Sequence, residues 1–377
     1  MNRTINRAKK GTSLFWILSC CLFSAVLLVG MLTMESPPAL PEVGDVDLRE
    51  SSQQNLSNRV SGVLDGLVSV RRTYMLRDSD MVAPKPRAEC YGQTEDPEQI
   101  REILDQAAEL LGGQETLFTP ETEIMPGSVI HWYLDETILV ITWKQVVDDG
   151  VYTFSEVKIA HASQLRRFLS EGKYNSGILR TTTEMSESVN AVMASSGDYY
   201  DYRETGIVVY NGHVYRDRGY LLDTCYIDEN GDLLFTYPGE YTEKEKIQTF
   251  VDENNIRFSL CFGPVMIRDG EYCVPRRYNS GEINGYYARA ALCQLGQLHY
   301  AVVTANTEEP NMCVPKLSQF ARRLQEMGIP TAYALDGGQT AAIVMDNQLI
   351  NKVSYGSQRE ISDIFYFATA LPETGKE

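Results

Sequence analysis

The feature that most limits how this chain can fold is an uncharged apolar run near its N-terminus. Residues 12–34 read TSLFWILSCCLFSAVLLVGMLTM, a stretch of 23 residues that ends before Glu35. A helix of about 20 apolar residues is long enough to cross a bilayer core. Four basic residues and no acidic one precede the run, which favours a cytoplasmic N-terminus by the positive-inside rule. The sequence therefore predicts a cytoplasmic tail over 1–11 and a transmembrane helix over 12–34.

A cleaved signal peptide is the alternative interpretation of this run. Its apolar core would span only about 7–15 residues and would end at a cleavage site made of small residues. The chain continues instead with Leu32-Thr33-Met34-Glu35, which lacks such a site. We therefore expect an uncleaved anchor in the cell membrane, with the large C-terminal part on the extracytoplasmic side.

The exported part is strongly acidic. Without the four basic residues of the tail, 30 Lys and Arg face 51 Asp and Glu, a net charge of −21. Such a field disfavours nucleic acid and anionic lipid headgroups as partners. An anionic substrate would need a local basic pocket set against it.

Cysteine usage leaves the redox question open. Six cysteines lie outside the apolar run, and an even number in an exported domain permits disulfides. A domain of this size can also bury a core without them. No CxxC pair or Cys/His cluster with metal-ligand spacing occurs, so a structural zinc site is not expected. No cofactor is expected either. Asp148-Asp149 leaves calcium binding open as an alternative to a solvated loop.

The segment 35–128 reads as a stalk followed by helices. Residues 36–60 are rich in Pro, Ser, Asn and Gln, and apolar residues then recur at helical spacing over 57–75. A second helix is predicted from the Asp96-Pro97 cap to Gly112-Gly113. Whether this helix pair packs on the main domain or on a partner stays open at this point.

From residue 129 the pattern predicts one α+β domain that reaches residue 373, a mixed β-sheet with packed helices. Strand-like runs such as 138–146 and 151–160 alternate with short helices predicted over 163–172 and 316–328. Later strand-like runs include GIVVYNG, DLLFTYP, PVMIRDG, HYAVVTAN, AAIVMDN and DIFYFATAL.

Several turns between these strands carry Gly, Asp or Arg. They read SSGDYY, SLCFGP, YARAA, LDGGQT and REISD, and each alone is explained as a turn or a strand end. The common catalytic signatures GxSxG, HExxH, GxxxxGK[ST] and GxGxxG are missing.

Taken together and in order, the motifs resemble the phosphodiester glycosidase family, in its bacterial membrane-anchored branch. The resemblance is carried by SSGDYY, TGIVVYNG, SLCFGP, ARAALC, VVTANT, LDGGQTA and REISD, and it covers about residues 129–370. It implies a hydrolase that cleaves the glycosyl bond of a sugar-1-phosphodiester, in an exopolysaccharide or a cell wall polymer. Arginine suits such a substrate because its planar fork binds phosphate in bidentate fashion.

The resemblance also implies a set of site residues. As catalytic groups it points to Asp336, Asp198 and Arg289, since glycosyl transfer to water commonly uses carboxylates. As substrate-binding groups it points to Gly197, Arg203, Gly263, Gly337, Gly338, Thr340, Arg359 and Asp363.

The sequence departs from the family pattern at Ser196, Gln339 and Ala305-Asn306. These departures keep two alternatives open. One is a catalytically degenerate relative that binds a glycan or a protein at the cell surface. The other is an architectural membrane protein that assembles through its helix pair.

Overall fold

The computed structural model describes residues 75–371 except 79, 149, 199, 280–282 and 309–312. They belong to one compact unit that spans 65–377. The predicted tail, the apolar run 12–34 and nearly all of the helix predicted over 57–75 lie outside the described residues. Within the described part of the chain, no helix has the length and apolar character that a membrane crossing requires.

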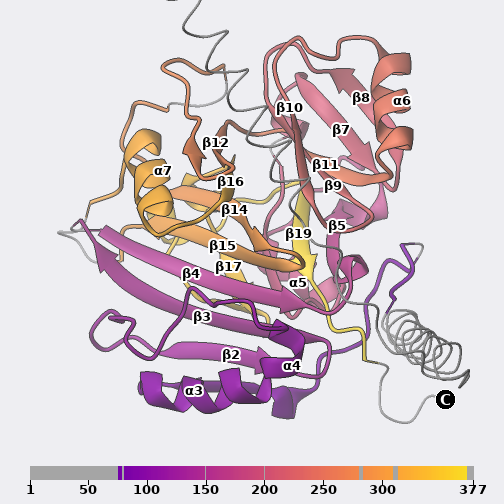
Figure 1. Ribbon diagram of the computed structural model, residues 1–377. Coiled ribbons are helices and arrows are strands. Elements are labelled where there is room, and N and C mark those ends of the chain that lie inside the picture. The colour runs from indigo at the N-terminus through magenta and orange to yellow at the C-terminus, as the bar shows by residue number, and fades with distance from the viewer. Residues whose placement is uncertain are drawn as a thin grey trace, which may run out of the picture. The chain divides into compact units, whose positions relative to one another are not determined.

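A nine-stranded sheet is the largest element (Figure 1). Its strands, in spatial order, are β1 (Tyr91–Thr94), β2 (Ile130–Leu134), β3 (Ile138–Val147), β4 (Gly150–Ile159), β15 (His299–Asn306), β14 (Arg289–Gly296), β16 (Thr331–Leu335), β12 (Val265–Arg268) and β13 (Glu271–Tyr272).

Both faces of this sheet are covered, because successive side chains of a strand point to opposite faces. Val140 of β3 and Val157 of β4 enter the central core, whereas Ile141 and Phe154 of the same two strands enter a second core on the other face. Every residue of β4 is consequently buried.

Helices α3 (Pro97–Gln106), α4 (Ala108–Leu111) and α7 (Leu317–Glu326) bury their apolar sides in that second core. The Asp96 side chain caps α3 by accepting from the Glu98 amide at 3.0 Å, and α4 ends at Gly112 with φ 61°. The helices predicted from Asp96-Pro97 to Gly112 and over 316–328 are confirmed, and the first of them is divided into α3 and α4 at Ala107. The segment before residue 129 packs on the main domain, since Ile100 contacts the same core as α7 and β1 pairs with β2.

Two five-stranded sheets complete the unit. One has the order β10 (Leu233–Thr236), β9 (Thr224–Asp228), β11 (Ile256–Leu260), β7 (Gly206–Tyr210), β8 (His213–Arg218) and is covered by α6 (Lys244–Glu253). The other has the order β18 (Gln348–Leu349), β17 (Ile343–Met345), β6 (Met193–Ser196), β19 (Asp363–Phe367), β5 (Leu165–Leu169), and α5 (Thr182–Ser188) packs against it.

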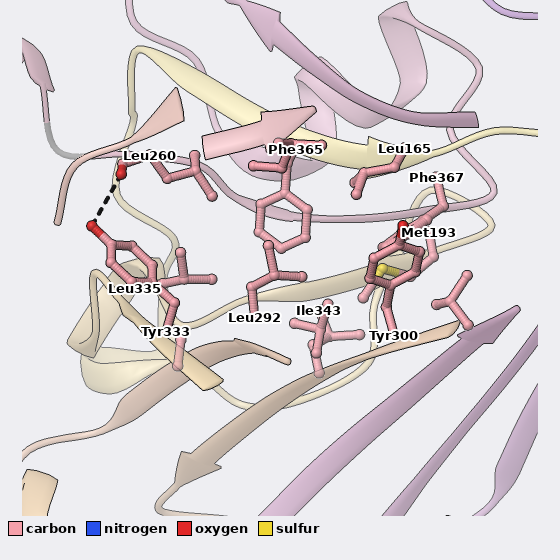
Figure 2. Packing of buried hydrophobic residues seen from close by; sticks show 14 of the residues in the cluster. Leu165, Met193, Leu260, Leu292, Tyr300, Tyr333, Leu335, Ile343, Phe365 and Phe367 are labelled. Carbon is pink, nitrogen blue, oxygen red and sulfur yellow. Dashed lines mark hydrogen bonds between the residues drawn. The ribbon is translucent and has the colours of Figure 1, made fainter. Parts of the chain in front are cut away.

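The central core joins all three sheets (Figure 2). Leu292 of β14 and Phe365 of β19 face one another across it, and the Tyr333 hydroxyl donates to the Leu260 carbonyl at 3.0 Å. This contact ties the large sheet to the end of β11, where one of the Gly-bearing motifs begins.

The predicted α+β class is confirmed, with the refinement that every strand pairing of the described residues is antiparallel rather than mixed. The helix predicted over 163–172 is wrong. Ala162–Gln164 form one 3-10 turn, and Leu165–Leu169 pair with β19 as strand β5. Its helix-like spacing was overridden by tertiary pairing. All six cysteines outside the apolar run are free.

Candidate functional site

Antiparallel pairing brings two of the predicted site residues to the same end of the large sheet. Arg289 is the first residue of β14, and its neighbour Ala290 pairs with Leu335, the last residue of β16. Asp336, the next residue after β16, therefore lies beside Arg289. The Gly263 amide donates to the Ala334 carbonyl at 3.2 Å, which brings the end of the Phe-Gly-Pro motif to the same place.

A cavity of about 380 Å³ opens at this sheet end. Predicted residues in its lining are Gly263, Arg289, Asp336, Gly337, Gly338 and Arg359. The resemblance had not implied the other lining residues as site residues, which include Phe262, Tyr287 and Tyr355. Gln339, one of the departures from the family pattern, also lines the cavity.

Asp336 is the acidic residue of the cavity wall. Its Oδ1 accepts from the Gly337 amide at 3.0 Å, and its Oδ2 lies 3.8 Å from a terminal guanidinium nitrogen of Arg359. Burial raises the pKa of Asp336 above its ordinary value, and the charge of Arg359 acts against that rise. A carboxyl group with a raised pKa can exchange a proton closer to neutral pH.

The two arginines of the cavity are held in different ways. Arg289 donates to the backbone carbonyls of Gly285 at 2.6 Å and Pro315 at 3.3 Å, and its guanidinium lies 5.6 Å from the Tyr287 ring centroid. The described lining of the cavity thus brings together two arginines and one aspartate. Planar guanidinium groups suit the oxygens of a phosphodiester.

Gly337 and Gly338, which follow Asp336, allow the turn to lie close to the backbone of Ala288. A Cβ atom on Gly337 would lie 2.1 Å from the Ala288 carbonyl oxygen, and Gly338 adopts φ 68°. The Gly338 amide donates to Ala288 at 3.1 Å, and the Thr340 hydroxyl donates to the Gly337 carbonyl at 2.7 Å. Both glycine amides thus donate within the protein, so the pair shapes the turn that carries Asp336.

A second cluster of charged residues lies where β6 ends and β19 begins. Asp363 opens β19, and the Asp198 amide donates to its Oδ1 at 3.0 Å. Arg167 of β5 joins both carboxylates: its Nε lies 2.7 Å from Asp363 and a terminal nitrogen lies 3.7 Å from Asp198. All three side chains are fully buried. Arg167 was not predicted as a site residue, because residues 163–172 were assigned to a helix.

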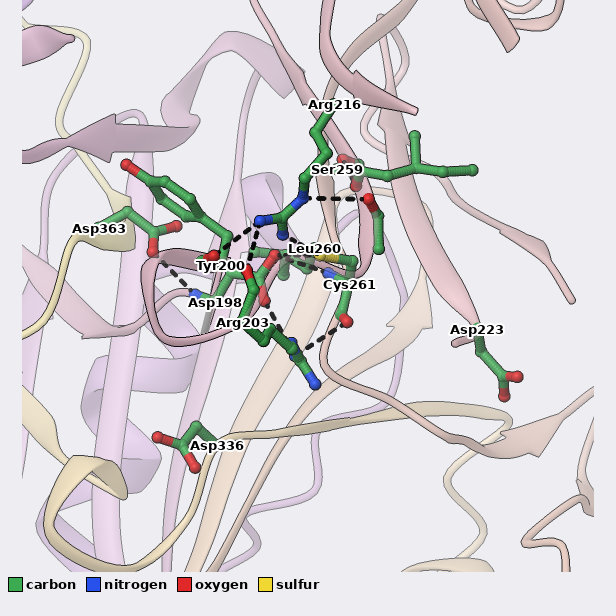
Figure 3. A network of polar contacts seen from close by, with 12 residues as sticks. Asp198, Tyr200, Arg203, Arg216, Asp223, Ser259, Leu260, Cys261, Asp336 and Asp363 are labelled. Carbon is green, nitrogen blue, oxygen red and sulfur yellow. Dashed lines mark hydrogen bonds and ion pairs between the residues drawn. The ribbon is translucent and has the colours of Figure 1, made fainter. Parts of the chain in front are cut away.

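Asp198 has further partners (Figure 3). Its Oδ2 accepts from the Cys261 amide at 2.9 Å and from the Cys261 thiol at 2.8 Å, and Arg203 lies 3.5 Å from its Oδ1. Although burial opposes ionisation, Arg203 and Arg167 hold the pKa of Asp198 below its ordinary value. Burial raises the pKa of Asp363 to about 6. Asp336 lies apart from this cluster in Figure 3.

Comparison with known proteins agrees with the motifs. Residues 189–368 match the family model described as phosphodiester glycosidase. This stretch holds both charged clusters apart from Arg167. Residues 189–368 belong to the phosphodiester glycosidase family.

Solved structures resemble this chain at low sequence identity. The catalytic domain of zebrafish N-acetylglucosamine-1-phosphodiester alpha-N-acetylglucosaminidase, auto-inhibited by its pro-peptide, is 16% identical with a TM-score of 0.49, covering 61% of this chain and 82% of that one. A hypothetical protein from Synechocystis is 12% identical with a TM-score of 0.43, covering 66% and 65%. An exported protein from Burkholderia pseudomallei is 11% identical with a TM-score of 0.37, covering 58% and 74%. No curated protein matches.

The structure divides the residues that the phosphodiester glycosidase resemblance implied. Six of them line the cavity, whereas Gly197, Asp198, Arg203, Thr340 and Asp363 do not. Arg203 stands between the two groups, since its guanidinium lies 5.1 Å from the ring centroid of Phe262, a residue of the cavity wall. The roles of all eleven residues stay predictions.

The departures from the phosphodiester glycosidase pattern occupy two different settings. Asn306 is buried and accepts from the Asn351 side chain at 3.0 Å, so it serves the core. Ser196 is also buried. Only Gln339 lines the cavity, and its side-chain amide donates to the Ser357 carbonyl at 3.1 Å.

Proposed function

We propose that this protein hydrolyses the glycosyl bond of a sugar-1-phosphodiester. The observation that supports the proposal is the cavity wall in which Arg289 and Arg359 accompany Asp336. The arginine pair would bind the phosphodiester, and the carboxyl group would stand next to the anomeric carbon.

The reaction follows from these positions. A water molecule attacks the anomeric carbon, the bond from that carbon to the phosphate oxygen breaks, and the phosphomonoester leaves with the bonding electrons. Asp336 takes the proton from the water and stabilises the positive charge that develops on the sugar ring. The two arginines stabilise the leaving phosphate, which for that reason needs no separate acid to protonate it.

We further propose that the site works outside the cytoplasm. The support is the uncharged run 12–34 behind a basic tail, which would anchor the chain in the membrane. An exopolysaccharide or a wall polymer with sugar-1-phosphodiester links is then the substrate within reach.

The test is hydrolysis of a panel of sugar-1-phosphodiesters by the full-length chain, with free sugar and phosphomonoester both quantified. Turnover is expected, and it should fall by at least about 100-fold in Arg289→Ala and in Asp336→Asn. Arg268→Ala is the matched control, because Arg268 is an exposed arginine of β12 outside the cavity lining. Folded variants with wild-type turnover, or a folded wild type without turnover on the whole panel, would refute the proposal.

A non-catalytic module that binds sugar phosphates is the second candidate. Two observations favour it: Asp336 is the single carboxylate in the described lining of the cavity, and the Gln339 side chain stands where the family carries glycine. Glycosidases commonly use two carboxylates. Saturable binding of the diesters with no release of sugar would select this candidate.

A further inference from the structure

A second hollow of about 750 Å³ lies beside the cavity. The two share four lining residues: Tyr287, Ala288, Ser354 and Tyr355. The cavity alone is at the small end of the roughly 300–1,000 Å³ typical of ligand sites. Because the two hollows are adjacent, the second one is the neighbouring surface for a ligand that is larger than the cavity.

Three exposed tyrosines stand around the second hollow. Tyr286 is 61% exposed, Tyr287 is 53% exposed and Tyr355 is 93% exposed. Tyr355 also has φ 61°, a left-handed conformation that is unfavourable for a bulky residue. Large rings gathered at one exposed hollow mark a binding surface, because a tyrosine offers an apolar face and a polar tip together.

The rings are oriented by neighbouring cations. The Lys316 ammonium lies 5.0 Å from the Tyr286 ring centroid, and Arg289 lies against Tyr287. A ring that is already positioned loses less conformational freedom when a ligand binds, so more of the contact energy appears as affinity.

The floor of the second hollow is polar. Lys144 lies 3.3 Å from the Glu308 carboxylate, and the Lys352 amide donates to the same carboxylate at 2.9 Å. The Lys352 ammonium donates to the Glu308 backbone carbonyl. Two ammonium groups, one carboxylate and the Asn351 backbone segment form a mixed surface that suits sugar hydroxyls better than a purely apolar group.

We propose that the second hollow binds the saccharide on the leaving side of the phosphodiester, which makes the substrate a phosphodiester-linked oligo- or polysaccharide rather than a small diester. The inference rests on the proposed function, since it places the phosphate at Arg289 and Arg359. The sugar beyond the phosphate then stacks on the tyrosine rings while its hydroxyls meet Lys144, Lys352 and Glu308.

The experiment compares two substrates with the full-length chain: a sugar-1-phosphate methyl ester, and the same sugar-1-phosphate joined to a disaccharide. The wild type should hydrolyse the disaccharide diester with a kcat/KM at least about 10-fold higher, since only the disaccharide can reach the tyrosine rings and stack on their apolar faces. Tyr286→Ala should reduce that ratio several-fold, because Tyr286 lines the second hollow alone.

Tyr220→Ala is the matched control, since Tyr220 is also an exposed tyrosine but lies outside the lining of both hollows and should keep the wild-type ratio. A wild type that treats the two diesters alike, or a Tyr286→Ala variant that keeps the full preference, overturns the inference. If neither diester is hydrolysed, the proposed function fails separately. Calorimetry then measures the dissociation constants of the same two diesters. The wild type should bind the disaccharide diester more tightly than the methyl ester, and Tyr286→Ala should reduce this preference.

Discussion

Two groups of charged residues in this protein share their residue types but differ in their access to solvent. Arg167, Asp198 and Asp363 are fully buried and form ion pairs with one another. Arg289, Arg359 and Asp336 stand in the wall of a cavity, and Arg289 donates to two backbone carbonyls. A buried charge destabilises a fold when its partner is removed, whereas an arginine in a cavity wall can contact an anionic ligand. The same family motifs thus supply both a scaffold and a candidate site.

The largest expected effect comes from removing the arginine of the buried group. Arg167→Met leaves Asp363 in the core without its cation and leaves Asp198 with Arg203 alone, so the free energy of unfolding should fall by about 3–5 kcal/mol. Urea denaturation measures this. Arg166→Met is the matched control from the same strand, because Arg166 donates to the Asp80 and Arg77 carbonyls and to the Tyr366 hydroxyl. Equal losses in the two variants would show that Asp198 and Asp363 do not need Arg167.

The corresponding change in the cavity should affect turnover rather than folding. Asp336→Asn keeps an oxygen that accepts from the Gly337 amide, so the free energy of unfolding should stay within about 0.5 kcal/mol of the wild type. The rate of hydrolysis should fall by about 10²–10³. Asp363→Asn is the counterpart, and it should lower stability because Asp363 pairs with Arg167. If thermal unfolding shows equal losses for the two, Asp336 is a structural residue of its turn.

Asp223 shows what a buried carboxylate does when its hydrogen-bond partner is a backbone amide. It accepts from the Val265 amide at 2.8 Å, and burial raises its pKa to about 6. Because this pKa lies above the unfolded value, the contribution of Asp223 to stability is present below about pH 4 and is lost as the pH rises through about 6.

Asp223→Asn removes that titration while an acceptor oxygen remains. Relative to the wild type, the variant should therefore gain about 1–2 kcal/mol of unfolding free energy between pH 4 and pH 8, a value reduced for the partial exposure of the group. Urea midpoints at the two pH values measure the gain. A difference that does not change with pH would contradict the raised pKa.

The smallest expected effect concerns the pair within the cavity. Burial raises the pKa of Asp336 and the charge of Arg359 opposes that rise, so Arg359→Gln should raise this pKa further. If ionised Asp336 takes the proton from water, the rising limb of kcat/KM against pH should move to higher pH. Arg322→Gln, which changes an arginine stacked on Tyr272 outside the cavity, should leave the limb in place. Movement to lower pH would contradict the pairing.

Much of the fold was predictable from local patterns. The Asp96-Pro97 cap and the Gly112 stop gave helix bounds that the structure confirms, and so did the apolar stripe of α7. The segment 163–172 failed because its spacing fits a helix as well as a strand. Pairing with β19, a segment about 200 residues away, decided for the strand.

The site was predictable only in part. The motifs drew attention to Arg289, Asp336 and Arg359, which the structure places in one cavity. They gave no sign that Asp198 and Asp363 are buried beside Arg167, because a motif records residue types and not the depth at which they lie. Tyr286 and Tyr287 precede Ala288-Arg289 in the sequence, and this pair of aromatic residues could have indicated the second hollow.

The sequence by itself determined the family of residues 189–368, the ends of the helical segments over 96–112 and 316–328, and many of the strands, because caps, turns and apolar periodicity act over a few residues. Only the tertiary structure decided which charged residues meet one another and which meet solvent. The physical reason is that antiparallel pairing joins strand ends that are far apart in the chain. The depth at which these strand ends lie then sets whether an arginine is enclosed with carboxylates in the core or lines a cavity.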